Sequence, residues 1–257
     1  MFLIRKTRPS AGATALRNAM REAGQPAGFT ENSAFRQRHL ILNWGGESDP
    51  VAPNSRVLNS QAARRVALNK IAALTALSTA GVRVPQFFTS AEEARTYRAG
   101  LPARNNPIIL ARSTVTGEGG AGINVIRIGD NIPDGMPLYV QYVRKYAEYR
   151  AHIIAGECVA VQQKRAREGE ERTEDQMLIR NHANGWVFAT ENVDDHSDAV
   201  GSLGVLAAAA LSLDVAAIDI IRGRDNQLYV LEANTKPGLD SPTVLAAYVR
   251  KLTTLHP

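Results

Sequence analysis

Two apolar segments near the C-terminal end constrain the fold more than any other feature of the sequence. Residues 215–221 and 228–233 are rich in aliphatic side chains, and each segment contains one acidic residue, Asp219 and Glu232. Such segments around a short polar stretch predict a β-hairpin. Two carboxylates on one face of apolar strands repel each other, and each is costly to remove from water. That face must therefore either lie open to water or receive a cation between the acids.

The turn of this hairpin sets which residues face each other. Asp225 and Asn226 are expected to form a two-residue turn, which pairs residue 221 with residue 230. The same register places the two acidic side chains opposite each other, with Cβ atoms roughly 5 Å apart. Asn234 lies two positions beyond the second acid and faces the same way. Two carboxylates and an amide oxygen are ligands that Mg²⁺ prefers, so the hairpin predicts a magnesium site, with a solvated polar face as the alternative.

Composition places this hairpin in an ordinary globular protein. The 257 residues are 44% hydrophobic and 21% charged, which argues against disorder and suits a few compact lobes. The net charge of +5 permits an anionic partner without requiring one. The single cysteine, Cys158, excludes an intramolecular disulfide. The N-terminal apolar run is too short for a signal peptide, and Asp214 and Asp219 interrupt the longest apolar stretch, so we expect a cytoplasmic protein without a membrane-spanning helix.

The remaining pattern mixes helices and strands. Capping residues and apolar periodicity predict helices at residues 11–23, 61–80, 197–213 and from Pro242 onward, with a short helix after Ser90. Strands are expected at residues 2–6, 39–44, 82–88, 108–112, 123–128, 138–143, 149–154 and 158–163. Residues 165–175 are charged and predict a loop. Prominent hairpins among helices favour an α+β or mixed α/β fold.

A glycine-rich segment is the second candidate for chemistry. Residues 117–122 read Gly-Glu-Gly-Gly-Ala-Gly, a literal match to a dinucleotide-binding pattern. That interpretation requires a helix next, whereas residues 123–128 have a strand pattern, so we reject it. A glycine loop between two strands can cover a triphosphate with its backbone N–H groups. A plain flexible hairpin is the alternative, and the residues alone leave both open.

The C-terminal hairpin carries a family resemblance. Residues 231–239, Leu-Glu-Ala-Asn-Thr-Lys-Pro-Gly-Leu, with Asp219 at hairpin distance, resemble the metal-binding end of the ATP-grasp ligases. The resemblance covers roughly residues 58–255 and is closest to the branch of the ribosomal-protein glutamate ligase and glutathione synthetase, and to short bacteriophage ATP-grasp proteins. It implies an ATP-grasp fold whose two lobes grip ATP. We expect a short N-terminal lobe with a linking helix at residues 1–84, which precedes the two lobes that grip ATP. These are residues 85–136 (small subdomain with the glycine loop) and 137–257 (C-terminal subdomain with the metal site).

The resemblance also implies roles for particular residues. It places Asp219, Glu232 and Asn234 on two Mg²⁺ ions, with Glu232 bridging them. The positions that it assigns to ATP are Lys70 and Arg112 on the phosphates, Gly117, Gly119, Gly120 and Gly122 in the covering loop, the backbone of Gln141, Tyr142 and Val143 at adenine, and Glu148 at the ribose. Around the transferred phosphate and acyl group it places Arg150, Lys164, Arg180 and Asn181. Arg112 stands where the family normally has lysine, and Ala217 stands where it often has arginine, so Arg150 or Arg180 is expected to take that arginine's part.

The function implied by the resemblance is that of a carboxylate–amine ligase. The γ-phosphoryl group of ATP passes to a substrate carboxylate, and an amine attacks the acyl phosphate to give an amide, ADP and phosphate. An amino acid is the expected substrate on one side, while the acceptor and the oligomeric state stay open. One alternative is a nucleic-acid-associated protein, motivated by the net charge and by five basic residues near the N-terminus: Arg5, Lys6, Arg8, Arg17 and Arg21. Another is a non-catalytic nucleotide-binding module, for which the unusual Arg112 is the argument.

Overall fold

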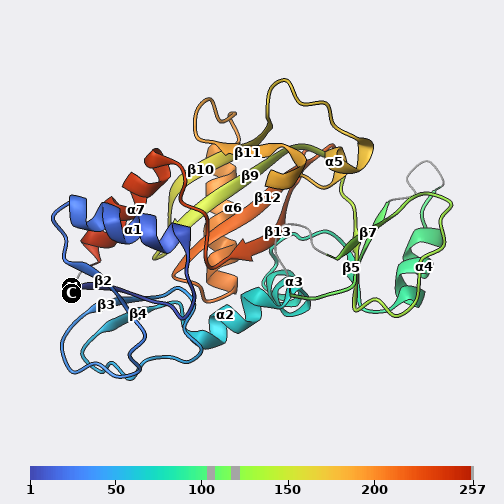
Figure 1. The fold of residues 1–257 in the computed structure, drawn as a ribbon. Coiled ribbons are helices and arrows are strands. Elements are labelled where there is room, and N and C mark those ends of the chain that lie inside the picture. The colour runs from blue at the N-terminus through green and yellow to red at the C-terminus, as the bar shows by residue number, and fades with distance from the viewer. Residues whose placement is uncertain (103–107, 117–121, 256–257) are drawn as a thin grey trace.

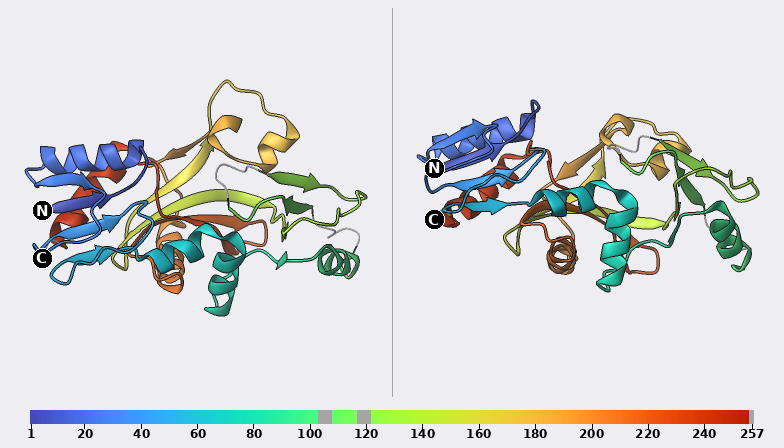
Figure 2. Two further views of the ribbon diagram at one scale, coloured as in Figure 1. Left: turned by 60° about the horizontal axis from the view of Figure 1, so that its bottom comes forward. Right: turned by 90° about the horizontal axis from the view of Figure 1, so that it is seen from below.

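The computed structural model describes residues 1–102, 108–116 and 122–255, which form three β-sheets arranged along the long axis of the molecule (Figures 1 and 2). The N-terminal sheet has the order β2-β1-β3-β4, with parallel pairing throughout. Its strands are β1 (Phe2–Arg5), β2 (Ala27–Thr30), β3 (Leu40–Asn43) and β4 (Arg56–Leu58). Helix α1 (Ala11–Glu22) begins at Ser10, whose side chain accepts from the backbone N–H of Ala13.

The small sheet at the other end of the molecule is antiparallel, with the order β5-β8-β6-β7. It contains β5 (Phe87–Phe88), β6 (Ile109–Arg112), β7 (Ile123–Ile126) and β8 (Leu138–Gln141), and α4 (Ala91–Ala99) packs against it. Helix α4 begins with the capping box predicted at Ser90, because the hydroxyl and the Glu93 carboxylate each bond a backbone N–H of the other residue.

The central sheet is antiparallel, with the order β11-β10-β9-β12-β13. Its strands are β9 (Lys145–Ile154), β10 (Glu157–Ala166), β11 (Trp186–Ala189), β12 (Val215–Gly223) and β13 (Leu228–Asn234). Helix α6 (Ser197–Ala210) covers one face, and it approaches so closely that a Cβ at Gly204 would lie 2.7 Å from the Cβ of Ala151. The opposite face carries the polar side chains of the candidate site.

The C-terminal helix α7 (Pro242–Thr254) joins the N-terminal lobe to the central sheet. It begins at Ser241, as predicted, and lies beside α1 (Figure 1). Its buried Val244, Tyr248 and Leu252 share one core with Leu16 of α1 and with the ends of β9 and β12. No helix within the described residues is long and apolar enough to cross a bilayer.

The single helix predicted over residues 61–80 is wrong, because it is two helices, α2 (Gln61–Leu68) and α3 (Lys70–Thr79). Asn69 separates them in an extended conformation, with φ −92° and ψ 110°. Its side-chain Oδ1 accepts from the N–H groups of Ile71 and Ala72, each at 3.1 Å. An asparagine side chain that bonds nearby backbone in this way competes with helix continuation, and here it makes Lys70 the first residue of a new helix.

The hairpin turn also differs from the prediction. The backbone N–H of Gly223 bonds the carbonyl of Gln227 at 2.8 Å, and Asn226 is left-handed with φ 62°. This is a three-residue loop, which pairs residue 221 with Tyr229 rather than with residue 230. An irregularity at Leu231 then adds one residue to β13 and restores the expected facing pair of Asp219 and Glu232. The facing pair was therefore predicted correctly through a turn that was wrong.

Three short strands were not expected, namely β2, β4 and β11. Strand β10 also runs two residues into the predicted loop at 165–175, because Arg165 and Ala166 pair with Val187 and Trp186 of β11. The rest of that charged segment connects to the short helix α5 (Glu174–Leu178). The division of the chain at residues 84 and 136 stays a prediction.

Candidate active site

A cleft of about 750 Å³ lies between the small sheet and the polar face of the central sheet. Its wall contains every predicted site residue that the structure describes except Gly122: Lys70, Arg112, Gln141, Tyr142, Val143, Glu148, Arg150, Lys164, Arg180, Asn181, Asp219, Glu232 and Asn234. Gly117, Gly119 and Gly120 lie outside the described residues. Residues far apart in the sequence thus meet in one cavity, and each of their roles stays a prediction.

The centre of the cleft is a single row of residues in register across four strands. Gln162 of β10 pairs with Arg150 of β9, Arg150 pairs with Asp219 of β12, and Asp219 pairs with Glu232 of β13. Residues in register on neighbouring strands point to the same face, so strand pairing by itself brings these side chains together. The row places one cation beside the two acids that the sequence singled out.

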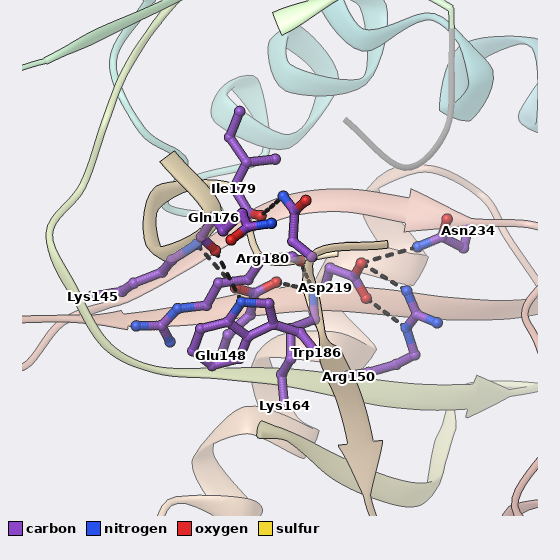
Figure 3. A network of polar contacts seen from close by, with 11 residues as sticks. Lys145, Glu148, Arg150, Lys164, Gln176, Ile179, Arg180, Trp186, Asp219 and Asn234 are labelled. Carbon is purple, nitrogen blue, oxygen red and sulfur yellow. Dashed lines mark hydrogen bonds and ion pairs between the residues drawn. The ribbon is translucent and has the colours of Figure 1, made fainter. Parts of the chain in front are cut away.

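Asp219 is held on both sides (Figure 3). The guanidinium of Arg150 donates from Nε to Oδ1 at 2.7 Å and from Nη2 to Oδ2 at 2.8 Å, and Nδ2 of Asn234 donates to Oδ2 at 3.3 Å. Burial opposes the charge of Arg150, but Asp219 outweighs it and raises the pKa of Arg150. The ring of Phe188 lies 4.1 Å from the guanidinium carbon and closes its other side. Arg150 and Asp219 therefore form a bidentate ion pair with a fixed geometry.

Glu232 has a cation of its own, the ammonium of Lys70, at 2.9 Å. Burial alone would raise the pKa of Glu232, but Lys70, followed by Arg112 and Arg150, outweighs it and lowers that pKa. The expected repulsion between the two acids is thus relieved by Lys70 and Arg150, and the protein needs no metal ion for this purpose. This corrects the sequence argument, which considered only a divalent cation or open water.

The donor set at this end of the cleft fits Mg²⁺. Asp219 and Glu232 present carboxylate oxygens in register, and Asn234 turns its amide nitrogen toward Asp219, which leaves the amide oxygen to face elsewhere. These are oxygen ligands of the kind that a hard divalent ion takes. Within residues 1–102, 108–116 and 122–255, no group of three or more His, Cys, Asp or Glu side chains could hold a metal ion. A metal here would thus depend on two carboxylates, one amide and oxygens of a ligand.

Glu148 precedes Arg150 by two residues on β9 and therefore faces the same side of the sheet, where it lies between two lysines (Figure 3). Its carboxylate bonds the ammonium of Lys145 at 3.0 Å and that of Lys164, and Lys164 also donates to the carbonyl of Arg180 at 2.8 Å. Burial lowers the pKa of Lys145, and Glu148 partly offsets this. The sequence analysis did not assign Lys145 to the site, although it lies only three residues before Glu148 in the sequence. Glu148 is therefore a buried acid with fixed partners at the place predicted for the ribose.

The predicted adenine-binding segment follows β8. The N–H of Gln141 bonds the carbonyl of Gln86, and the N–H of Tyr142 bonds the carbonyl of Ile108, both at 2.8 Å. No backbone carbonyl in the described parts of the chain accepts from the N–H of Val143. Val143 is therefore the residue of this segment whose backbone donor remains available to a ligand.

Arg180 and Asn181 come from the segment that follows α5. The guanidinium carbon of Arg180 lies 4.4 Å from the ring of Trp186, and burial lowers the pKa of Arg180. Asn181 caps a short 3₁₀ turn, His182–Asn184, by accepting from the N–H of Asn184 at 2.8 Å. Trp186, which the sequence analysis did not assign to the site, thus orients one of the predicted basic groups.

Backbone hydrogen bonds hold the described residues on both sides of the glycine loop. The carbonyl of Gly122, which has φ 70°, accepts from the N–H of Ser113 at 2.9 Å. The N–H of Lys70 bonds the carbonyl of Val115 at 2.9 Å, which ties the start of α3 to the segment after β6. Burial lowers the pKa of Arg112, while Glu232 partly offsets this. The loop's ends therefore lie beside the cations predicted to bind phosphate.

Two of the five basic N-terminal residues that motivated a nucleic-acid partner bind backbone carbonyls within the N-terminal lobe. Arg5 is buried and donates to the carbonyls of Asn32 at 3.1 Å and Ser48 at 2.5 Å. Arg21 donates to the carbonyl of Ala27 at 2.7 Å. These two arginines therefore stabilise the N-terminal lobe itself.

Comparison with known proteins gives a family match. A model described as the RimK-like ATP-grasp domain matches residues 67–245. The protein of Haemophilus influenzae (strain PittEE) named "Probable alpha-L-glutamate ligase" is 30% identical over 194 residues, 71% of this chain and 60% of that protein. A protein of the same name from Mannheimia succiniciproducens is 28% identical over 222 residues, 78% of this chain and 69% of that protein. The chain thus spans 60% of the length of the first of these relatives.

Solved structures match nearly the full length of the chain. The ATP-grasp ligase PsnB complexed with a minimal precursor has 14% sequence identity and a TM-score of 0.71, over 98% of each chain. The D-alanine–D-alanine ligase from Bacillus anthracis has 12% identity and a TM-score of 0.64, over 99% of this chain and 95% of that chain. At these identities the likeness establishes the fold, and together with the family match it confirms the predicted ATP-grasp fold.

Proposed function

Because the chain belongs to the RimK-like ATP-grasp domain family, we propose that it is an ATP-dependent ligase that joins a carboxylate to an amine. The observation that carries this proposal is the row of Arg150, Asp219 and Glu232 across the floor of the cleft, with Lys70 against the last residue. Acids that can hold a cation and bases that can hold phosphate lie within one cavity. That combination suits phosphoryl transfer, where catalysis is mainly positioning and charge neutralisation.

The placement of ATP follows from the residues that line the cleft. We assign the adenine to the backbone of Gln141–Val143, where the N–H of Val143 is available, and the ribose to Glu148. The triphosphate then extends toward Lys70 and Arg112, the cations nearest to Glu232. Mg²⁺, held by Asp219, Glu232 and Asn234, would neutralise phosphate charge at this end.

The cations of the site have to change partners when ATP binds. Lys70 and Arg150 now neutralise the two acids. If a metal ion occupied those acids, Lys70 and Arg150 would be free to bind phosphate oxygens. The carboxylate oxygen of the substrate attacks the γ-phosphorus, ADP leaves, and an amine then displaces phosphate from the acyl phosphate. Arg150 and Arg180, with Lys164 and Asn181, are proposed to steady the oxygens that gain charge in these steps.

The substrate class rests on the relatives. Two carry the name "Probable alpha-L-glutamate ligase", and one solved structure of similar fold is complexed with a minimal precursor. We therefore propose L-glutamate as the first amino acid to test, with a peptide or a second amino acid as its partner.

A substrate screen tests the proposal. The chain is incubated with MgATP, single amino acids and short acidic peptides, with and without hydroxylamine as a general amine, and ADP release and hydroxamate formation are measured. Substrate-dependent ADP with hydroxamate supports a ligase. ATP binding without any turnover, across amino acids and peptides, would instead support the non-catalytic module.

A further inference from the structure

A buried chain of three polar side chains ends at the cleft and has no part in the proposed roles above. The imidazole of His152 lies between the hydroxyl of Tyr248, 3.1 Å from Nδ1, and Oε1 of Gln162, 2.9 Å from Nε2. His152 and Tyr248 have no exposed surface, and Gln162 is 6% exposed. The three residues come from β9, α7 and β10, so the chain connects the C-terminal helix to the floor of the cleft.

The chemistry of these groups fixes the direction of the hydrogen bonds. Burial lowers the pKa of His152 to about 4, so its ring is neutral and carries one N–H. Oε1 of Gln162 can only accept, so that N–H is on Nε2, and Nδ1 accepts from the hydroxyl of Tyr248. With the opposite direction, the Tyr248 hydroxyl hydrogen would have no acceptor in the described part of the core, which is unfavourable for a fully buried group. The donors therefore run from Tyr248 through His152 to Gln162.

This direction leaves the amide nitrogen of Gln162 as the free end. Gln162 lines the cleft and is the cross-strand neighbour of Arg150. No residue within the described ranges accepts a hydrogen bond from its Nε2. Ala217, in register with His152 on the other side of β9, is too small to reach into this part of the floor. The cleft thus has a neutral donor, locked in orientation, next to the charged end of the row.

We propose that Gln162 donates a hydrogen bond from Nε2 to the acyl oxygen of the carboxylate substrate, and that His152 and Tyr248 are positioning residues that hold it in this orientation. The proposal deepens the ligase function proposed above and rests on it. A glutamine free to rotate would also present its oxygen to the substrate, and that oxygen would repel a carboxylate. The relay removes this unproductive orientation before the substrate arrives.

The step concerned is attack on the acyl phosphate. The lone pair of the amine forms the C–N bond, and the π pair of the carbonyl moves onto its oxygen, which becomes an oxyanion. That pair returns as the bond from carbon to the phosphate oxygen breaks, so phosphate leaves, and the amine proton passes to phosphate or water. The Nε2 donor of Gln162 is strongest when the oxygen is charged, so it stabilises the transition state more than the bound substrate.

The relay is tested first without any substrate. In ¹⁵N-histidine-labelled protein, long-range ¹H–¹⁵N spectra distinguish a protonated ring nitrogen from an unprotonated one, and His152→Gln identifies the signals of this ring. We expect a neutral ring with the proton on Nε2. A proton on Nδ1, or a charged ring at neutral pH, would overturn the proposal whether or not the chain is a ligase.

The function of the relay is tested by a double-mutant cycle. Gln162→Met keeps the volume and removes the donor, and Tyr248→Phe removes one hydroxyl. With MgATP, L-glutamate and hydroxylamine, each single variant should lower kcat by about 10- to 100-fold with little change in the KM for ATP. In the Gln162→Met background, Tyr248→Phe should have no further effect on kcat, because the relay has nothing left to orient.

Tyr149→Phe is the matched control. Tyr149 is also fully buried on β9, but its hydroxyl donates to Asp194 at 2.7 Å, and neither residue lines the cleft. It should lose stability and keep its kcat. Additive losses in the double variant, or an equal loss in Tyr149→Phe, would mean that Tyr248 acts through general stability and would contradict the relay. A wild-type chain inactive with this probe would count against L-glutamate as substrate, while the ring spectra would still decide the relay.

Discussion

Arg150 and Asp219 are cross-strand neighbours joined by two hydrogen bonds, 2.7 Å from Nε to Oδ1 and 2.8 Å from Nη2 to Oδ2. Asp219 is also one of the proposed metal ligands. A metal ion bound there would compete with Arg150 for the same carboxylate. The guanidinium holds the acid in one orientation, and it would become free for phosphate or acyl oxygens if a metal took its place.

Replacing Arg150 by Met should reveal this competition. Without a divalent ion the variant leaves Asp219 buried and unpaired, which should cost about 3 kcal/mol of unfolding free energy. Mg²⁺ should then stabilise the variant more than the wild type, because it meets no competing cation. Urea unfolding in EDTA and in excess MgCl₂ measures both effects. Arg222→Met, which removes an arginine that bonds His196 away from the cleft, is the control and should show no extra response to Mg²⁺.

Glu232→Gln should abolish turnover and should not stabilise the protein. Lys70 loses its ionic partner at 2.9 Å, and since the two side chains are 14% and 33% exposed, the cost should be about 1 kcal/mol. A variant more stable than the wild type in EDTA would show that repulsion between the acids prevails. The pairing lowers the pKa of Glu232, so its contribution is complete above the ordinary value of 4.5 and is lost as the pH falls through the lowered value.

Asn69→Ala should weaken ATP binding through the helix break. The side chain of Asn69 caps α3, and alanine would favour one continuous helix that moves Lys70. Stability should fall by about 1 kcal/mol, the usual cost of losing an N-cap. Ser60→Ala removes the N-cap of α2 and should cost a similar amount. Thermal unfolding should therefore show comparable losses, whereas the KM for ATP should rise in Asn69→Ala alone; a rise of equal size in both variants would contradict the explanation.

Acid should destabilise the protein partly through His152. Burial lowers the pKa of His152 to about 4 from 6.5. Between these two pH values the imidazole binds a proton in the unfolded chain and stays neutral in the folded chain. The contribution is complete above pH 6.5 and is lost as the pH falls toward 4. Between about pH 7 and about pH 5, the unfolding free energy of the wild type should fall by about 2 kcal/mol more than that of His152→Gln. Parallel pH profiles for the two proteins would contradict the shift.

Local sequence signals located the acids but not their partners. Asp219, Glu232 and Asn234 were predicted to share a face from the register of one hairpin and from strand alternation, and both depend only on residues close in the sequence. The pairing of Lys70 with Glu232 spans 162 residues, and no local pattern reports it. Gln162 attracted no attention for the same reason, because its importance comes from strand pairing with β9 and from the His152 ring.

The turn and the helix break show a second limit. Asp225 and Asn226 suit both a two-residue and a three-residue loop, and the choice depended on an irregularity at Leu231 farther along the strand. Asn69 was compatible with a helix by apolar periodicity, yet its side chain found two backbone donors. The helix prediction failed at one polar side chain, and the turn prediction failed because of one extra residue in the strand.

The fate of oxygen from the substrate tests the central claim most directly. L-Glutamate labelled with ¹⁸O in its carboxylates is incubated with the chain, MgATP and hydroxylamine, and the products are analysed by ³¹P NMR and mass spectrometry. A ligase that works through an acyl phosphate should yield ADP and inorganic phosphate that carries one ¹⁸O from the carboxylate. AMP carrying the label, together with pyrophosphate, would contradict transfer of the γ-phosphoryl group and the residue roles proposed for it.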